Sequence, residues 1–121
     1  PEDVADLTVL DCDPSVLSGV KIIFSALDAS VAGDIEKKFA QAGFAVFTNA
    51  ANHRMDAQVP ILVPFVNPSH LDSVKAQRET SKCSGFIVAN ANCSSTGLAV
   101  ALKYIFFLIR ARGHSFLKPD H

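Results

Sequence analysis

The stretch GFIVANANCSSTG, residues 85–97, decides the fold. It begins with an apolar run that ends at Ala89, as in a strand buried on both faces of a sheet. It continues with Ser94 and Thr96, residue types that often begin a helix. Cys93 therefore lies at a predicted strand-to-helix junction. A helix N-terminus carries unpaired N–H groups and a partial positive charge, so it stabilises a thiolate or an oxyanion beside it.

Strand and helix patterns alternate along the chain. The segments rich in β-branched and aromatic residues, which we expect to be strands, are 7–10, 21–27, 44–48, 60–66 and 85–89. Helices are expected over the amphipathic segment 29–41, from a cap at Ser69 onward, and after Cys93. The prolines in 60–66 confine that strand to an edge or an extended crossing. This order predicts an α/β fold, a Rossmann-like and mostly parallel sheet with flanking helices.

A parallel α/β sheet binds its ligands outside the carboxyl ends of its strands, so we expect residues 25–28, 49–54 and 90–93 to meet at one edge. Taken alone, the polar residues there have ordinary explanations. A lone cysteine such as Cys93 is most often a small buried hydrophobe, Arg54 is a solvated loop residue, and Ser25 is a strand-end residue.

Composition narrows the class of protein. The chain has 121 residues, enough for one small core, and its net charge of −1 argues against a nucleic-acid surface. Its three separated cysteines predict neither a disulfide framework nor a metal site, and they favour the reducing cytoplasm. The acidic N-terminus does not resemble a signal peptide. The apolar run 97–109 contains Lys103 and is shorter than the roughly 20 residues of a bilayer span, so we expect a buried helix and no membrane partner.

Three segments resemble the aspartate-semialdehyde dehydrogenase family in its fungal and archaeal form. NANCSSTG, residues 90–97, resembles the active-site cysteine motif, and FSALD, residues 24–28, resembles the strand end that lines the dinucleotide site. Residues 49–54, followed by VPILVPFVNP at 59–68, resemble the linker and the VP-x-VNP segment. The resemblance implies that residues 1–103 are part of an NAD(P)-binding domain. Residues 104–121 do not resemble the family's continuation, and we expect no separate domain there.

The resemblance also implies an activity. Members of the family are NADP-dependent oxidoreductases that interconvert L-aspartyl 4-phosphate and L-aspartate 4-semialdehyde, with release or uptake of phosphate. They serve threonine, methionine, lysine and isoleucine biosynthesis. By this resemblance Cys93 attacks the acyl phosphate and forms an acyl-thioester, which hydride from NADPH then reduces. Asn92 orients the acyl oxygen, and the N–H of Cys93 stabilises its charge.

The remaining site residues follow from the same resemblance. Ser25, Ala26 and Leu27 are expected to run beside the cofactor, NADP. Arg54 is expected to bind phosphate, because a planar guanidinium makes bidentate contacts with phosphate oxygens. No metal is expected. The resemblance also implies a homo-oligomeric parent enzyme.

The chain departs from the family at both ends. A dinucleotide-binding half normally opens with a glycine-rich turn, but the glycines here are isolated. We therefore expect an incomplete sheet that lacks the first βα unit, and no second domain with its catalytic histidine. His114 and His121 match no motif position. An inactive isolated chain is the expected outcome.

Three alternatives stay open. The first is an enzyme like N-acetyl-glutamyl-phosphate reductase, which has similar thiol chemistry, although the segment 59–68 favours the aspartate enzyme. The second is a non-catalytic fragment or interaction module. The third, a cysteine hydrolase, requires a histidine partner, and none is recognisable in the sequence.

Other conspicuous residues are expected to be structural. Cys12 and Cys83 lack a comparable motif, His53 is expected to be exposed, and Asn67 is expected to fix a turn. The last helix carries an apolar stripe that we expect to pack in the core, formed by Leu98, Val100, Ala101 and Ile105.

Overall fold

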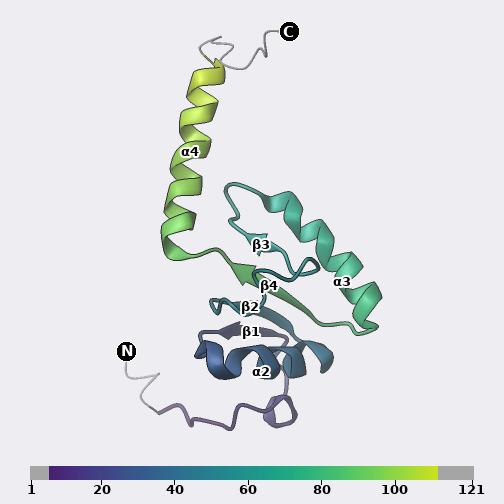
Figure 1. Ribbon diagram of the computed structural model, residues 1–121. Coiled ribbons are helices and arrows are strands. Elements are labelled where there is room, and N and C mark those ends of the chain that lie inside the picture. Colours follow the sequence, from purple (N-terminus) through teal and green to yellow (C-terminus); the bar gives the residue numbers. More distant parts are fainter. Residues whose placement is uncertain (1–5, 112–121) are drawn as a thin grey trace.

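A computed structural model describes residues 6–111, and its elements follow the predicted alternation (Figure 1). In chain order they are the 3-10 helix η1 (Pro14–Val16), β1 (Ile22–Ser25), α2 (Ala29–Gln41), β2 (Ala45–Thr48), β3 (Ile61–Leu62), the 3-10 helix η2 (Pro68–Asp72), α3 (Ser73–Ser81), β4 (Phe86–Asn90) and α4 (Cys93–Ala111). The strands form a parallel sheet in the order β1-β2-β4-β3. The predicted α/β architecture is confirmed, and the short proline-bounded strand β3 lies at an edge.

The register of the sheet aligns the carboxyl ends of its strands. Ser25 pairs with Thr48, Thr48 pairs with Ala89, and Ala89 pairs with Ile61. The loops that leave β1, β2 and β4 therefore start from the same edge. This confirms that the three polar segments predicted to meet at one edge do so.

Helix α2 has the bounds that its pattern predicts. Asp28 caps it, with its carboxylate accepting a hydrogen bond from Ser30 N at 2.8 Å. The same contact holds the pKa of Asp28 below its usual value. On the inner face, Phe39 packs in the core with Val46 and other strand residues. The helix is followed by Gly43, whose φ of 96° is a conformation that favours glycine.

Gly85 lets β4 begin close against α2. A Cβ atom at this position would lie 2.1 Å from Ala40 O and 2.6 Å from Phe44 O, so no side chain fits. Phe86 N donates to Phe44 O at 3.1 Å just beyond it. The glycine that opens the quoted stretch thus sets where the strand leading to Cys93 starts.

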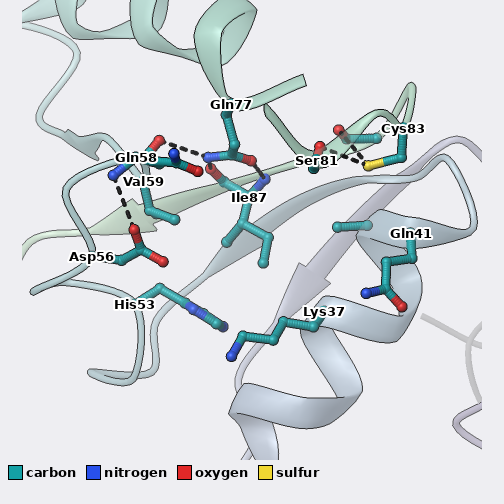
Figure 2. A pocket seen from close by; sticks show the side chains of 12 residues that line it. Lys37, Gln41, His53, Asp56, Gln58, Val59, Gln77, Ser81, Cys83 and Ile87 are labelled. Atoms are coloured by element: carbon teal, nitrogen blue, oxygen red, sulfur yellow. Dashed lines mark hydrogen bonds between the residues drawn. The ribbon is translucent and has the colours of Figure 1, made fainter. Parts of the chain in front are cut away.

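Gln77 of α3 completes the hydrogen bonding of β4 where β3 does not reach. Its amide accepts a hydrogen bond from Ile87 N at 2.6 Å and donates to Ile87 O at 3.1 Å (Figure 2). The same amide nitrogen also donates to Gln58 O at 2.9 Å. An amide side chain therefore takes the place of a neighbouring strand and leaves the backbone of Ile87 satisfied.

Two local predictions are wrong. Residues 7–10 form no strand, and Val9 is 95% exposed, because no described element packs against or pairs with this segment. Ser69 does not cap a helix, because η2 begins one residue earlier and α3 begins at Ser73.

Asn67 fixes the turn before η2, as predicted. Its Oδ1 accepts from Val63 N at 2.7 Å and its Nδ2 donates to Ile61 O at 2.9 Å.

The prediction of a buried last helix is also wrong. Helix α4 extends away from the sheet, and it has no buried residue (Figure 1). The stripe expected in the core is largely exposed, with Leu98 at 60% and Ile105 at 52%. By length and composition α4 is a candidate membrane span, with a mean hydropathy of 1.3. Lys103 ties the helix to the loop before η2 by donating to the carbonyls of Phe65 and Val66. The apolar periodicity of this segment predicts that one face of the helix is apolar, but it does not indicate whether another element packs against that face.

Candidate active site

Cys93 is the first residue of α4, and Asn92 caps the helix in front of it. Asn92 Oδ1 accepts a hydrogen bond from Ser94 N at 3.0 Å, and its carbonyl oxygen accepts one from Thr96 N at 2.8 Å. The Cys93 thiol is exposed, and its Sγ lies 3.8 Å from Asn92 Oδ1. The predicted strand-to-helix junction at Cys93 is therefore confirmed.

The cap limits what Asn92 offers to a ligand. Its amide oxygen is engaged by the helix, so the two amide N–H groups are the donors that its side chain presents. These donors belong to the residue that precedes the thiol.

Arg54 links the ends of two strands. Its Nε donates to Asn90 O at 3.0 Å and its Nη2 donates to Asn49 O at 2.8 Å. Asn90 and Asn49 are themselves joined, with Nδ2 of Asn90 donating to Oδ1 of Asn49 at 2.6 Å. These contacts fix the plane of the guanidinium while three of its five N–H groups stay available to an anion.

Cys93, Asn92 and Arg54 line one pocket of about 550 Å³. This volume falls within the roughly 300–1,000 Å³ of small-molecule sites. The other residues that line it are Asn49, Leu62, Pro64, Asn90, Ala91 and Thr96. Among these described residues the only cation is the guanidinium, and there is neither a carboxylate nor an imidazole. The electrostatics of the pocket favour an anionic ligand.

The three residues expected beside the cofactor lie outside this pocket. Ser25 ends β1, Ala26 and Leu27 follow it, and all three line a separate recess of about 120 Å³. Ser25 is 8% exposed, and its hydroxyl donates to Glu36 Oε1 at 2.5 Å. Ala26 is exposed at the same carboxyl edge as Arg54. Three of the six predicted site residues, Cys93, Asn92 and Arg54, therefore line one pocket. The other three lie at the same edge of the sheet at the end of β1, and β2 lies between β1 and β4.

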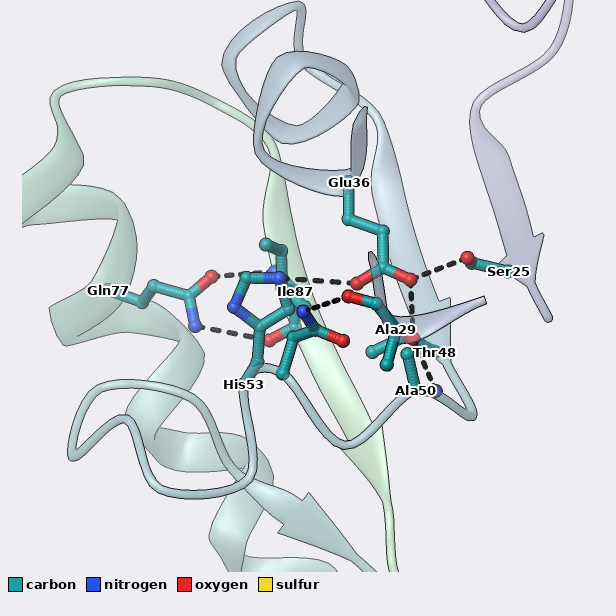
Figure 3. A network of polar contacts seen from close by, with 9 residues as sticks. Ser25, Ala29, Glu36, Thr48, Ala50, His53, Gln77 and Ile87 are labelled. Carbon is teal, nitrogen blue, oxygen red and sulfur yellow. Dashed lines mark hydrogen bonds and ion pairs between the residues drawn. The ribbon is translucent and has the colours of Figure 1, made fainter. Parts of the chain in front are cut away.

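Sequence reasoning missed a buried polar network beneath this edge. Glu36 is 1% exposed, and its Oε1 also accepts from Thr48 Oγ1 at 2.6 Å (Figure 3). Its Oε2 lies 3.2 Å from His53 Nε2. The expectation that His53 is exposed is wrong, because it is 3% exposed. The sequence does contain a signal for the burial of Glu36. This residue follows Ala32 by four positions and precedes Phe39 by three, and this spacing puts it on the apolar face of α2.

The remaining cysteines are free thiols outside the site. Cys12 is exposed and lines the recess beside Ser25. Cys83 is partly buried, with its Sγ 3.0 Å from Ser81 Oγ, and lines a small pocket of about 150 Å³ (Figure 2). His114 and His121 lie outside the described residues.

The sequence is similar to known proteins. The family model of the semialdehyde dehydrogenase NAD-binding domain matches residues 1–74. The aspartate-semialdehyde dehydrogenase of Trichophyton rubrum is 50% identical over 104 residues, and that of Saccharomyces cerevisiae is 44% identical over 108 residues. Both alignments cover 85% of this chain, and they cover 29% and 30% of the relatives. The chain therefore spans less than a third of the length of these curated relatives.

Solved structures also align over most of the chain. The crystal structure of aspartate-semialdehyde dehydrogenase with NADP from Candida albicans superposes with a TM-score of 0.76 at 41% identity. It covers 88% of this chain and 32% of its own. A related protein of different activity, the malonyl-CoA reductase (NADP) of Metallosphaera sedula, is 39% identical over 106 residues, covering 88% of this chain and 30% of its own.

Proposed function

The chain belongs to the semialdehyde dehydrogenase family, and we propose that it supplies the thiol and anion site of an NADP-dependent aspartate-semialdehyde dehydrogenase. The observation that carries this proposal is the pocket shared by Cys93 and Arg54. A thiol at a helix N-terminus next to a fixed guanidinium suits an acyl phosphate, which has an electrophilic carbon and an anionic leaving group.

Each residue has a part in the reaction. The Cys93 thiolate attacks C4 of L-aspartyl 4-phosphate, a C–S bond forms, and the C–O bond to phosphate breaks. Arg54 binds the phosphoryl group and the departing phosphate. The Asn92 amide and the backbone N–H of Cys93 stabilise the negative charge on the acyl oxygen. The product is an acyl-thioester on Cys93, and bound NADPH supplies the hydride that converts it to L-aspartate 4-semialdehyde.

The end of β1 fits the cofactor through its backbone. In the described part of the chain, the N–H and C=O groups of Ala26 and Leu27 make no hydrogen bond, and they lie at the edge where parallel sheets bind dinucleotides. Ser25 contributes position instead of a direct contact, because its hydroxyl is engaged by Glu36. NADP specificity is supported by the Candida albicans complex.

The proposal extends to the chain as a whole. Residues 1–103 form part of the NAD(P)-binding domain, residues 104–121 lie outside the domain homologous to the family, and the 121-residue chain alone does not turn over. The short share of the relatives' length and the lack of an imidazole among the described residues of the pocket support this. The free thiols support a cytoplasmic setting. The aspartate-semialdehyde dehydrogenase relatives support a part in threonine, methionine, lysine or isoleucine biosynthesis. The working enzyme is a homo-oligomer.

A second candidate follows from the malonyl-CoA reductase relative. An acyl-CoA thioester would also acylate Cys93, but the bond broken would be a C–S bond, the leaving group would be the thiol of CoA, and no inorganic phosphate would be released. Phosphate dependence of the reaction separates the two candidates.

A chimera tests the proposal. Residues 1–103 replace the homologous segment of the Candida albicans enzyme, and NADP reduction is measured with L-aspartate 4-semialdehyde, with and without phosphate. We expect phosphate-dependent turnover that Cys93→Ser abolishes and Cys12→Ser leaves unchanged. A folded chimera that keeps its rate after Cys93→Ser, or that needs no phosphate, would rule out the proposed function.

A further inference from the structure

Glu36 is the largest of the fully buried side chains, and its carboxylate meets three different segments of the sheet edge. Ser25 is the last residue of β1, Thr48 is the last residue of β2, and His53 belongs to the loop that follows β2 (Figure 3). The three contacts are 2.5, 2.6 and 3.2 Å long. One side chain on α2 therefore joins the end beside the proposed cofactor site to the loop that carries Arg54.

A carboxylate in this position needs its partners. Burial of an unpaired carboxylate is costly, and an apolar residue would otherwise suit this face of α2. Two hydroxyl donors satisfy Oε1, and Oε2 and His53 Nε2 have no partner other than each other within the described residues. The network continues through Thr48 Oγ1, which accepts from Ala50 N at 2.9 Å. The carboxylate thus fixes both the strand ends and the start of the loop.

The loop after β2 is anchored at two neighbouring residues, and the Arg54 side chain that follows them extends toward β4. Asn52 Nδ2 donates to Ala29 O at 2.8 Å, and the next residue, His53, is buried against Glu36. Arg54 follows and reaches the carbonyls of Asn90 and Asn49 at the edge of the Cys93 pocket. Because His53 is anchored on the inner side, the backbone turn presents Arg54 to the pocket.

We propose that Glu36 is a positioning residue of the anion site: through His53 it fixes residues 49–54 so that the Arg54 guanidinium faces the pocket of Cys93. Through Ser25 and Thr48 it aligns the ends of β1 and β2 with that loop. The effect of Glu36 on phosphate affinity rests on the proposed function, in which Arg54 binds the phosphate. The effect of Glu36 on the orientation of the Arg54 side chain is independent of that function.

Two substitutions at Glu36 separate positioning from packing. Glu36→Gln keeps an oxygen that accepts from Ser25 and Thr48, and its amide N–H can donate to a ring nitrogen of His53. Glu36→Leu keeps a similar volume and removes all three contacts. Phe39→Leu is the matched control, because Phe39 lies in the core one turn along α2, is 4% exposed and belongs to no polar network.

The readouts use the 121-residue chain. The Nε–H signal of Arg54 in a nitrogen–proton spectrum, assigned by its loss in Arg54→Lys, reports the bond to Asn90 O. Titration with inorganic phosphate gives the affinity of the pocket, with Arg54→Ala as the reference for a lost site. For Glu36→Leu we expect Nε–H exchange with water to accelerate, and phosphate affinity to fall, by roughly tenfold each, as for one lost charged hydrogen bond. Glu36→Gln stays within about threefold of wild type.

The outcomes are distinct. Unchanged Nε–H exchange in Glu36→Leu overturns the positioning role, and so does an equal loss in a Phe39→Leu protein with the same drop in Tm. If wild type binds no phosphate, or if Arg54→Ala binds it equally well, the proposed role of Arg54 fails while the Nε–H exchange still decides the role of Glu36.

Discussion

Asn92 and Cys93 are adjacent residues of the proposed active site, and Asn92 has two proposed roles in it. The amide oxygen of Asn92 caps α4, and its N–H groups stay available beside an exposed thiol. Capping stabilises the helix that holds the thiol at its first residue. A change at Asn92 can therefore act on the helix, on the chemistry, or on both.

Two substitutions separate these effects. Asn92→Asp keeps an oxygen that accepts from Ser94 N but loses the N–H donors, so the stability of the chain should be retained while acylation of Cys93 slows. Asn92→Ala loses both, and unfolding should be easier by about 1 kcal/mol, the usual value of an N-cap. Urea unfolding and the rate of thiol acylation measure the two effects. Wild-type acylation in Asn92→Asp would remove the amide from the mechanism.

Some residues of the site are predictable from sequence and others are not. Cys93 is predictable because an apolar run, a cap and a helix start are all local signals. The contact of Arg54 with Asn90 O joins residues that are 36 positions apart, so no local pattern contains it. The burial of His53 depends on Glu36, a glutamate on an apolar helix face, and short loops carry no periodicity that would reveal it.

At the scale of elements, α2 matches its predicted bounds because its cap, its apolar face and its terminal glycine all agree. Helix α3 and strand β4 are joined by a contact that lies in neither pattern, the hydrogen bonds of the Gln77 side chain with the backbone of Ile87. Sequence patterns describe one element at a time, so they do not reveal that the Gln77 side chain makes the hydrogen bonds with β4 that a neighbouring strand would otherwise make.

The cap of α2 gives its stability a pH dependence. The pKa of Asp28 is lowered by its hydrogen bonds with Ser30, so the charged cap stabilises the folded chain above the ordinary aspartate value of about 3.9. That contribution is lost as the pH falls below this value through the folded pKa. The Tm difference between wild type and Asp28→Asn should be positive at neutral pH and vanish in acid. A difference that is constant from pH 7 to pH 2 would contradict the capping charge.

The amide of Gln77 should matter more than its exposed neighbours on α3. Gln77→Ala leaves the N–H and C=O of Ile87 without partners in a buried place, which should cost about 3 kcal/mol in the free energy of unfolding. Glu79→Ala, on the same helix and exposed, should change it by less than about 0.5 kcal/mol. Denaturant unfolding compares the two. Equal effects would show that the strand edge is satisfied in another way.

At the scale of the whole molecule, the parallel sheet brings the thiol, the guanidinium and the end of β1 to one edge. A long apolar helix extends from that edge with no buried residue, and large apolar side chains such as Phe106 and Phe107 are more than half exposed. The fold class follows from the alternation of strand and helix patterns. The exposure of α4 does not, because periodicity cannot reveal whether a covering partner is present.

The central claim is that Cys93 is the nucleophile that takes the acyl group from an acyl phosphate. The chain is mixed with L-aspartyl 4-phosphate generated in situ by an aspartate kinase, without NADPH, and the adduct is located by mass spectrometry of the intact protein and its peptides. Cys12 is an exposed thiol in the same chain and serves as the internal control. The account predicts a thioester on Cys93 that forms faster than on Cys12 and slows in Arg54→Ala. An unmodified Cys93, or equal labelling of Cys93 and Cys12, would contradict it.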